Sequence, residues 1–133
     1  MSVYLDYNST TPPVEGVVDA VLACLTEDFG NPSSPHAYGR KPKAAVERAR
    51  RQVAAMCGVS PEGVIFTSGA TEANNLALKG LVTDARPLLV CCAVEHPSVL
   101  NVVEALGGRV VPVDADGVID LNALEEAVDD TVA

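Results

Sequence analysis

Short apolar runs and helical stretches alternate through the second half of the chain, from residue 60 onward. The apolar runs are 64–67, 88–94 and 110–113. Stretches with helical periodicity follow each of them, at 71–81, at 98–106, and at a last helix marked by Leu121, Leu124 and Val128. Strands joined by helical crossovers pair in parallel, with right-handed connections. The alternation therefore predicts an α/β fold that is built on a parallel sheet.

Two helices are predicted ahead of this alternation. The first spans about 14–27, where one face is apolar through Val14, Val17, Val18, Val21, Leu22 and Leu25. The second spans about 42–57, with Pro42 in its first turn and Gly58 as its C-terminal stop. The predicted order is therefore two helices followed by three strand–helix pairs.

The predicted sheet has three strands, and strands this apolar need cover on both faces. Pro112 places the third strand at an edge or near its end, because proline cannot donate a ladder hydrogen bond. The sequence reaches Ala133 where a further strand is due. We therefore expect a single incomplete unit, with 1–58 as an N-terminal segment carrying two helices and 59–133 as the first part of a three-layer α/β domain. Such a unit exposes apolar surface unless a second chain covers it.

Composition narrows the classes of function. The 133 residues are 48% hydrophobic and 20% charged, as in one ordinary globular domain, which excludes a disordered chain. Nine Lys and Arg against eighteen Asp and Glu give a net charge of −9, which argues against binding nucleic acid through its phosphate backbone. No apolar run approaches the roughly 18 residues of a membrane-spanning helix, and no secretory leader is recognisable. We expect a cytoplasmic protein without a membrane partner.

The four cysteines are Cys24, Cys57, Cys91 and Cys92. They show neither CxxC spacing nor a neighbouring cluster of histidines, so no zinc site and no disulfide framework is indicated. Because all four fall inside apolar stretches, we expect them to be small buried hydrophobic residues rather than reactive thiols.

The sharpest chemical signal is the segment 66–72, which reads FTSGATE. Here a predicted strand breaks at Gly69 and a helix begins, so free backbone N–H groups and the positive end of a helix dipole point at one place. The hydroxyls of Ser68 and Thr71 are further donors, and a phosphate fits such a site. The same residues also make an ordinary helix start, with a capping hydroxyl and Glu72 in the first turn. The residues alone leave both interpretations open.

His96 follows the apolar run 88–94, just before a predicted helix. A residue at the C-terminal end of a parallel strand faces the crevice where α/β proteins bind ligands. If the strands are neighbours, His96 stands beside the Gly69 turn. A surface histidine near a helix N-terminus is the equally weighted alternative.

The loop at 29–40 is dense in glycine and in Asn and Ser turn formers, and it carries His36 and Tyr38. It is too long for a simple spacer, so it either lines a site or is a structural loop whose aromatic rings pack locally.

Four segments match a known family in order and spacing over almost the whole chain. They are YLDYNSTTP at 4–12, GNPSS at 30–34 followed by His36 and Gly39-Arg40, FTSGATEANNL at 66–76, and Glu95-His96. Together they resemble the start of cysteine desulfurases of the NifS/IscS type, which are fold-type I, pyridoxal-phosphate-dependent relatives of the class V aminotransferases. The resemblance implies that 59–133 begins the large cofactor-binding α/β domain of such an enzyme.

The resemblance also implies roles for individual residues. Ala70 and Thr71, next to Gly69, look like the residues that hold the cofactor phosphate. His96 looks like the family's histidine that stacks on the pyridine ring and takes part in proton transfer. Two further stretches resemble segments that line the site, and their candidate substrate-lining residues are Asn8, Asn31 and Ser33.

In the family, L-cysteine is converted to L-alanine, and an enzyme cysteine takes the sulfur as a persulfide for iron–sulfur cluster or other sulfur-transfer biosynthesis. Family members are homodimers that pass the sulfur to an acceptor protein. The family's Schiff-base lysine, in a Ser-x-His-Lys context, and its persulfide cysteine have no counterpart here. The chain's lysines are Lys41, Lys43 and Lys79, and none has that context.

Two explanations follow from this resemblance. Either the chain is the N-terminal part of a desulfurase and is inactive without the remainder, or it is a non-catalytic remnant that binds a phosphate ligand or a desulfurase subunit.

Overall fold

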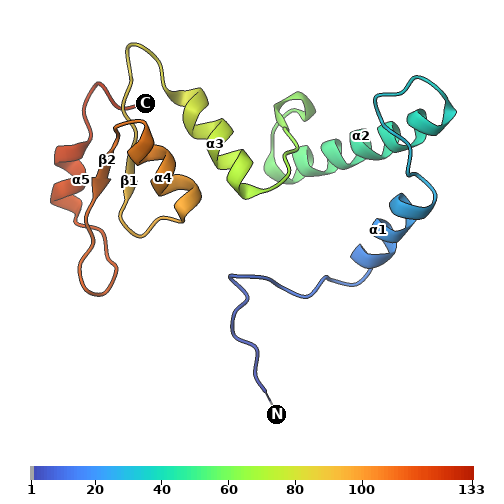
Figure 1. Ribbon diagram of the computed structural model, residues 1–133, viewed down its shortest axis with the longest axis horizontal. Helices are drawn as coiled ribbons and strands as arrows, with labels where there is room; N and C mark the ends of the chain where they lie inside the picture. Colours follow the sequence, from blue (N-terminus) through green and yellow to red (C-terminus); the bar gives the residue numbers. More distant parts are fainter. Residues whose placement is uncertain (1) are drawn as a thin grey trace. The chain divides into compact units, whose positions relative to one another are not determined.

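The computed structural model, which describes residues 2–133, shows all of the predicted helices and two of the three predicted strands (Figure 1). The helices are α1 (Val17–Thr26), α2 (Ala37–Cys57), the short 3-10 helix η1 (Pro61–Gly63), α3 (Ala70–Leu81), α4 (Pro97–Ala105) and α5 (Leu121–Ala127). The strands are β1 (Val90–Cys92) and β2 (Arg109–Val111). The chain divides into two units between Ile65 and Phe66. Whether 59–133 is the first part of a larger domain stays a prediction.

In the unit up to Ile65, α1 confirms the first predicted helix, and none of its residues is buried. Its apolar face stays exposed, with Leu25 70% and Val18 60% accessible. Helix α2 ends at Cys57 before Gly58, as predicted. The Arg50 guanidinium donates to the carbonyl of Val64, which fastens the segment after η1 to α2.

Helix α2 begins five residues earlier than predicted, so Pro42 lies inside the helix instead of in its first turn. A proline at this position leaves the carbonyl four residues back, that of Tyr38, without its helical N–H partner. This carbonyl lies against the loop instead: a Cβ on Gly30 would stand 2.0 Å from the Tyr38 oxygen. The helical hydrogen bond that Pro42 removes is therefore lost where the loop packs against the first turns of α2, and the helix continues through the proline.

The strand predicted at 64–67 is wrong. These residues have no strand or helix assignment, and Ile65 and Phe66 are 69% and 49% exposed. A strand needs a hydrogen-bonded neighbour, and the two named strands of residues 2–133 pair only with each other. Local β propensity without a partner did not produce a strand here.

In the unit from Phe66 onward, β1 and β2 pair in parallel, with Cys91 opposite Val110. Helix α4 makes the crossover between them and packs on both, and α5 contacts β2 (Figure 1). This arrangement confirms the predicted α/β class with a small parallel sheet. Pro112 directly follows β2, as its missing N–H predicts.

The C-terminal segment pairs with the chain just before β1. Leu88 and Val132 form a single parallel bridge, in which the Leu88 N–H donates to the Thr131 carbonyl at 3.1 Å. The Arg109 guanidinium fixes the same segment, donating to the Ala127 carbonyl at 2.6 Å and to the Asp129 carboxylate at 2.7 Å. The two-stranded sheet thus has a neighbour on the β1 side.

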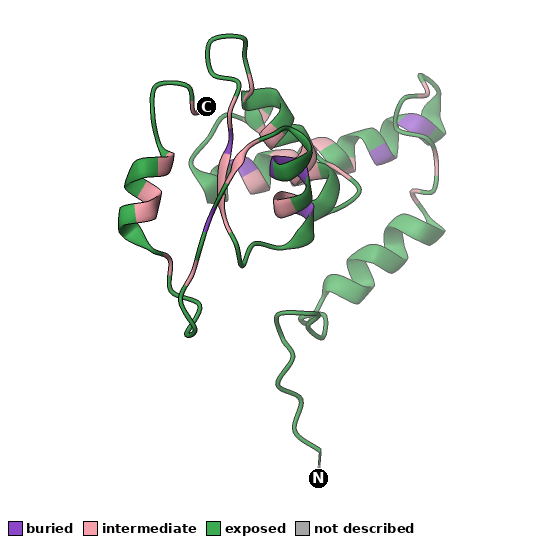
Figure 2. Cartoon of the chain, turned by 60° about the vertical axis from the view of Figure 1, so that its left-hand side comes forward, coloured by how far each residue is buried: buried purple, intermediate pink, exposed green. Residues whose placement is uncertain are grey.

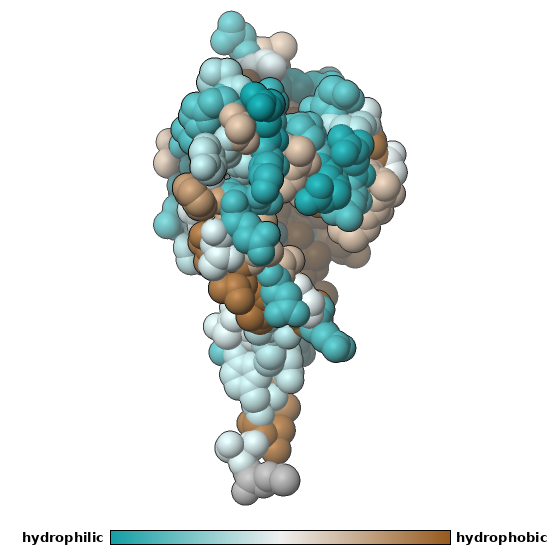
Figure 3. Space-filling view, turned by 90° about the vertical axis from the view of Figure 1, so that its right-hand side faces the viewer, coloured by the Kyte–Doolittle hydropathy of each residue, from teal (hydrophilic) through white to brown (hydrophobic). Residues whose placement is uncertain are grey.

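Few apolar side chains are buried, as the incomplete sheet predicts. In the second unit they gather where α4 meets the strands, at Leu89, Val102, Val103 and Val111 (Figure 2). Apolar side chains are exposed among the hydrophilic ones elsewhere, and Figure 3 shows such brown surface on one face. None of the described helices is both long and apolar enough to cross a membrane.

Replacing Gly39 by Ala should destabilise the first unit. Gly39 is buried in α2, and a Cβ there would stand 2.1 Å from the Ser34 carbonyl oxygen and 2.7 Å from that of Asn31. Backbone atoms cannot swing away as a side chain does, so we expect a loss of about 1–3 kcal/mol in the free energy of unfolding. Urea unfolding of the full chain measures it. Gly63→Ala is the matched control, because its nearest atom is the Ser60 hydroxyl at 4.0 Å; equal stability of the two variants would contradict the packing.

Candidate functional site

The turn before α3 leaves backbone donors open. Gly69 caps the helix with extended backbone and no side-chain cap. The hydrogen bonds of the described residues leave the N–H groups of Ala70 and Thr71 without an acceptor. No protein atom lies within 4 Å of the place that a Cβ on Gly69 would occupy, and Thr71 is exposed. The turn is therefore open to an anion that accepts several N–H bonds.

Ser68, by contrast, is already partnered, which corrects its prediction as an available donor. Its N–H and its hydroxyl both donate to one oxygen of Glu72, at 2.7 Å and 2.6 Å. These two bonds, the hydroxyl's first, lower the pKa of Glu72 because they stabilise the ionised carboxylate. The cap and the open turn thus coexist. Glu72 secures the backbone at Ser68, and the N–H donors of Ala70 and Thr71 remain available. The Ser–Glu spacing around a helix start was the signal for this contact.

His96 caps the N-terminus of α4, directly before Pro97. Its Nδ1 accepts the Ser98 N–H at 3.1 Å and lies 2.8 Å from the Ser98 hydroxyl. The Asn74 side chain, from α3, donates to the same hydroxyl at 2.8 Å. Sequence reasoning missed both Asn74 and Ser98. A serine two residues after His96 in a helix start was the available signal.

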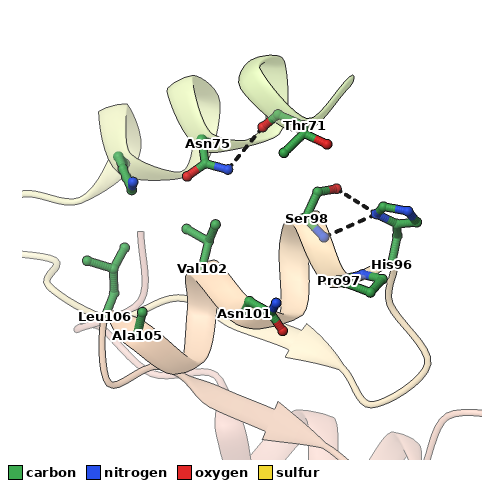
Figure 4. Close-up of a pocket in the computed structure, with 10 residues that line it drawn as sticks. Thr71, Asn75, His96, Pro97, Ser98, Asn101, Val102, Ala105 and Leu106 are labelled. Atoms are coloured by element: carbon green, nitrogen blue, oxygen red, sulfur yellow. Dashed lines mark hydrogen bonds between the residues drawn. The ribbon is translucent and has the colours of Figure 1, made fainter. Parts of the chain in front are cut away.

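Thr71 and His96 line one cavity of about 450 Å³ between α3 and α4 (Figure 4). The α3 side consists of Thr71, Asn75 and Lys79, which share one helix face at four-residue spacing. Asn75 is held by a bond from its side-chain amide to the Thr71 carbonyl, at 3.0 Å. The structure therefore brings together a hydroxyl at an open helix N-terminus and an imidazole ring, with an ammonium group two turns along.

The other predicted site residues, Asn8, Asn31 and Ser33, belong to the unit up to Ile65. Asn31 shapes its own loop, because its side-chain oxygen accepts the Ser33 N–H at 2.8 Å. Their assignment as substrate-lining residues stays a prediction. The rings in this loop also pack locally, with Phe29 and His36 6.1 Å and 6.4 Å from Tyr38 between centroids.

Comparison with known proteins gives one consistent match. The family model "Aminotransferase class-V" covers residues 3–133. A cysteine desulfurase of Frankia sp. strain EuIK1 is 43% identical over 98% of this chain and 32% of its own length, and one of Rattus norvegicus is 47% identical over 94% and 30%. A solved NifS-like protein superposes with a TM-score of 0.85 at 36% identity, covering 99% of this chain and 38% of its own. The chain spans about a third of the length of these relatives.

The prediction that all four cysteines are buried is wrong. Cys24 and Cys57 are exposed, Cys91 and Cys92 are half-buried, and all four are free thiols. No residue of α1 is buried, Cys24 included, and Cys57 is the last residue of α2. Among residues 2–133 no cluster of His, Cys, Asp and Glu could hold a metal ion.

Cys91 should react more slowly with iodoacetamide at neutral pH than an ordinary exposed thiol. Burial, with a smaller contribution from the Glu95 charge, raises the pKa of the Cys91 thiol. Less of it is therefore the reactive thiolate below its pKa. Peptide mass spectrometry after timed alkylation of the folded chain measures the rates, with Cys24 as the internal control. We expect the difference to shrink as the pH rises. Equal rates at both positions throughout would contradict the predicted shift.

Proposed function

Because the chain belongs to the class V aminotransferase family, we propose that it is the N-terminal part of a pyridoxal-phosphate-dependent cysteine desulfurase. The observation that carries this proposal is the joint position of Thr71, at an open helix N-terminus, and His96 on one cavity. In the complete enzyme, L-cysteine would yield L-alanine, and an enzyme cysteine would take up the sulfur. The desulfurases that the chain resembles support this substrate.

The turn at Gly69 suits the phosphate of this cofactor. The open N–H groups of Ala70 and Thr71 and the Thr71 hydroxyl are donors, and they stand at the positive end of α3. The helix dipole adds only about 0.3–1 kcal/mol, so the hydrogen bonds supply most of the affinity. Glu72 disfavours phosphate binding, because its carboxylate is negative and lies in the same first turn. Its oxygen, however, is turned to Ser68.

His96 suits the aromatic part of the cofactor. Its ring is exposed, it is held on one edge by Ser98, and it lines the cavity that Thr71 lines. When bound, pyridoxal phosphate supplies an electron-withdrawing ring that stabilises charge on the substrate's α-carbon. The flat imidazole offers a stacking surface, and its Nε2 is a site for proton transfer.

The remainder of the enzyme has to supply the cofactor-binding lysine and the persulfide cysteine. None of Lys41, Lys43 and Lys79 matches the family's lysine motif. Lys79 nevertheless lines the cavity, so it is the residue to test. Pyridoxal phosphate mixed with this chain should give no visible absorbance of a lysine-linked cofactor. Such absorbance, abolished in Lys79→Ala, would contradict the proposed division of roles.

Reconstitution tests the function directly. The chain, joined to or mixed with the remaining two thirds of a desulfurase, should release alanine from L-cysteine and retain the cofactor. A properly folded pair without alanine production would favour the alternative, a non-catalytic module that binds a phosphate ligand or a desulfurase subunit. For the complete enzyme we propose a cytoplasmic homodimer that passes sulfur to an acceptor protein for iron–sulfur cluster or related biosynthesis.

Thr71→Ala should weaken retention of pyridoxal phosphate in the reconstituted enzyme by about 1–3 kcal/mol, the value of one hydrogen bond to a charged group. Thr71→Ser keeps the hydroxyl and should retain the cofactor nearly as well. Equilibrium dialysis against pyridoxal phosphate measures both variants. If the alanine variant binds as tightly as the original chain, Thr71 is an ordinary helix residue.

His96→Ala should slow turnover far more than it loosens the cofactor. Proton transfer by a positioned side chain contributes typically about 10²–10⁴-fold to rate, whereas the cofactor phosphate is held by α3. The alanine release rate and the cofactor Kd, measured on the same reconstituted sample, separate the two effects. Comparable losses in both would show that His96 is structural.

A further inference from the structure

We propose that Asn74 and Ser98 are positioning residues that hold His96 in the tautomer with its proton on Nε2. Asn74 lies in the segment 66–76 that carries the resemblance, but neither Asn74 nor Ser98 has a role assigned above, and both contact His96 or its partner directly. The consequence for catalysis rests on the proposed function, because it concerns the histidine to which that function gives proton transfer. The tautomer itself depends only on the contacts of this chain.

The backbone N–H of Ser98 determines that Nδ1 of His96 accepts a hydrogen bond. A peptide N–H can only donate, and that of Ser98 lies 3.1 Å from Nδ1 of His96. Nδ1 must therefore present its lone pair. Since a neutral imidazole carries one N–H, the proton of the neutral ring is on Nε2.

The Ser98 hydroxyl adds to this preference, because Asn74 orients it. Ser98 is only 8% exposed, so the hydroxyl has little access to water. The Asn74 amide donates to its oxygen at 2.8 Å, and the hydroxyl has a single hydrogen to place. Nδ1 of His96, at 2.8 Å, is the acceptor within reach. The hydrogen bonds thus run in one direction, from Asn74 through Ser98 to His96.

The relay connects the two helices that carry the site. Asn74 is one turn after Thr71 on α3. Ser98, which Figure 4 shows beside His96, lies in the first turn of α4. A shift of α4 against α3 would therefore break the bond from Asn74 to Ser98, whereas the contacts of Ser98 with His96, both at the start of α4, would remain. On its other edge, Nε2 has no hydrogen-bond partner among residues 2–133. The relay leaves this nitrogen, with its proton, as the edge available to a bound molecule.

Nitrogen NMR of the full chain labelled with ¹⁵N-histidine tests the tautomer without cofactor. The sequence has two histidines, and His36 caps α2 without a side-chain hydrogen bond, so it is an internal reference. At a pH where both rings are neutral, the ratio of Nε2–H to Nδ1–H forms should be about five-fold larger at His96, as expected for one added net hydrogen bond. A protonated Nδ1 at His96, or a ratio equal to that of His36, would overturn the proposal.

Variants then separate the relay from general folding. Ser98→Ala and Asn74→Ala should each lower the His96 ratio by about two- to five-fold. Ser98→Thr keeps the hydroxyl and should restore it. Asn101→Ala is the matched control, because Asn101 lies on the same helix as Ser98 and has no bond to the relay. An unchanged ratio in folded Ser98→Ala would overturn the role of the hydroxyl. If that variant does not fold, the original chain and Ser98→Thr still decide the tautomer.

The reconstituted enzyme distinguishes this inference from the proposed function. Asn74→Ala should lower kcat by about ten-fold and leave the cofactor Kd unchanged, a smaller loss than that from removing the proton-transfer group itself. If no version binds the cofactor, the proposed function fails while the NMR result stands. If the cofactor binds but the original chain shows no tautomer preference, the relay is wrong and the proposed function remains.

Discussion

The packing of α4 against β1 and β2 is the constraint on which the rest of the second unit depends. Val103 and Val111 are its two fully buried large side chains, at 0% and 1% exposure, and they come from the crossover helix and the strand after it. Burying them favours one placement of α4 over the strands. That placement puts the start of α4, with His96 as its cap, beside α3. The candidate site is thus a consequence of a small apolar core.

Two helix N-termini meet at the site, and they satisfy their first N–H groups differently. At α4, the side chain of His96 caps the helix by accepting the Ser98 N–H. At α3, no side chain caps the N–H groups of Ala70 and Thr71, while Glu72 turns back to Ser68. Because an unused donor is the more available one, the α3 end is where an anion gains most. This difference supports a division of roles in which α3 binds phosphate and α4 supplies the imidazole.

Much of the apolar surface of the described residues is exposed. Helix α1 buries none of its residues, and many large apolar side chains elsewhere are exposed. A sheet of two strands is marginal unless further strands or helices cover it. The chain spans about a third of the length of the desulfurases that it resembles. The exposed apolar surface therefore agrees with the proposal that the function belongs to a larger assembly.

The sequence by itself determined the helices and the parallel α/β class, because hydrophobic periodicity and glycine and proline signals are local. It also marked Thr71 and His96 through their motifs.

Tertiary structure decided every feature that depends on contact with a distant part of the chain. Residues 64–67 pair with neither of the named strands and do not form one, and Cys24 is exposed with the rest of α1, none of whose residues is buried. Likewise, Pro42 lies inside α2, in the part of the helix where Gly30 closely approaches the Tyr38 carbonyl. The Asn74–Ser98–His96 relay joins two helices through Asn74 and Ser98, which are 24 positions apart in the chain, and a contact of that kind exists only once the helices have packed.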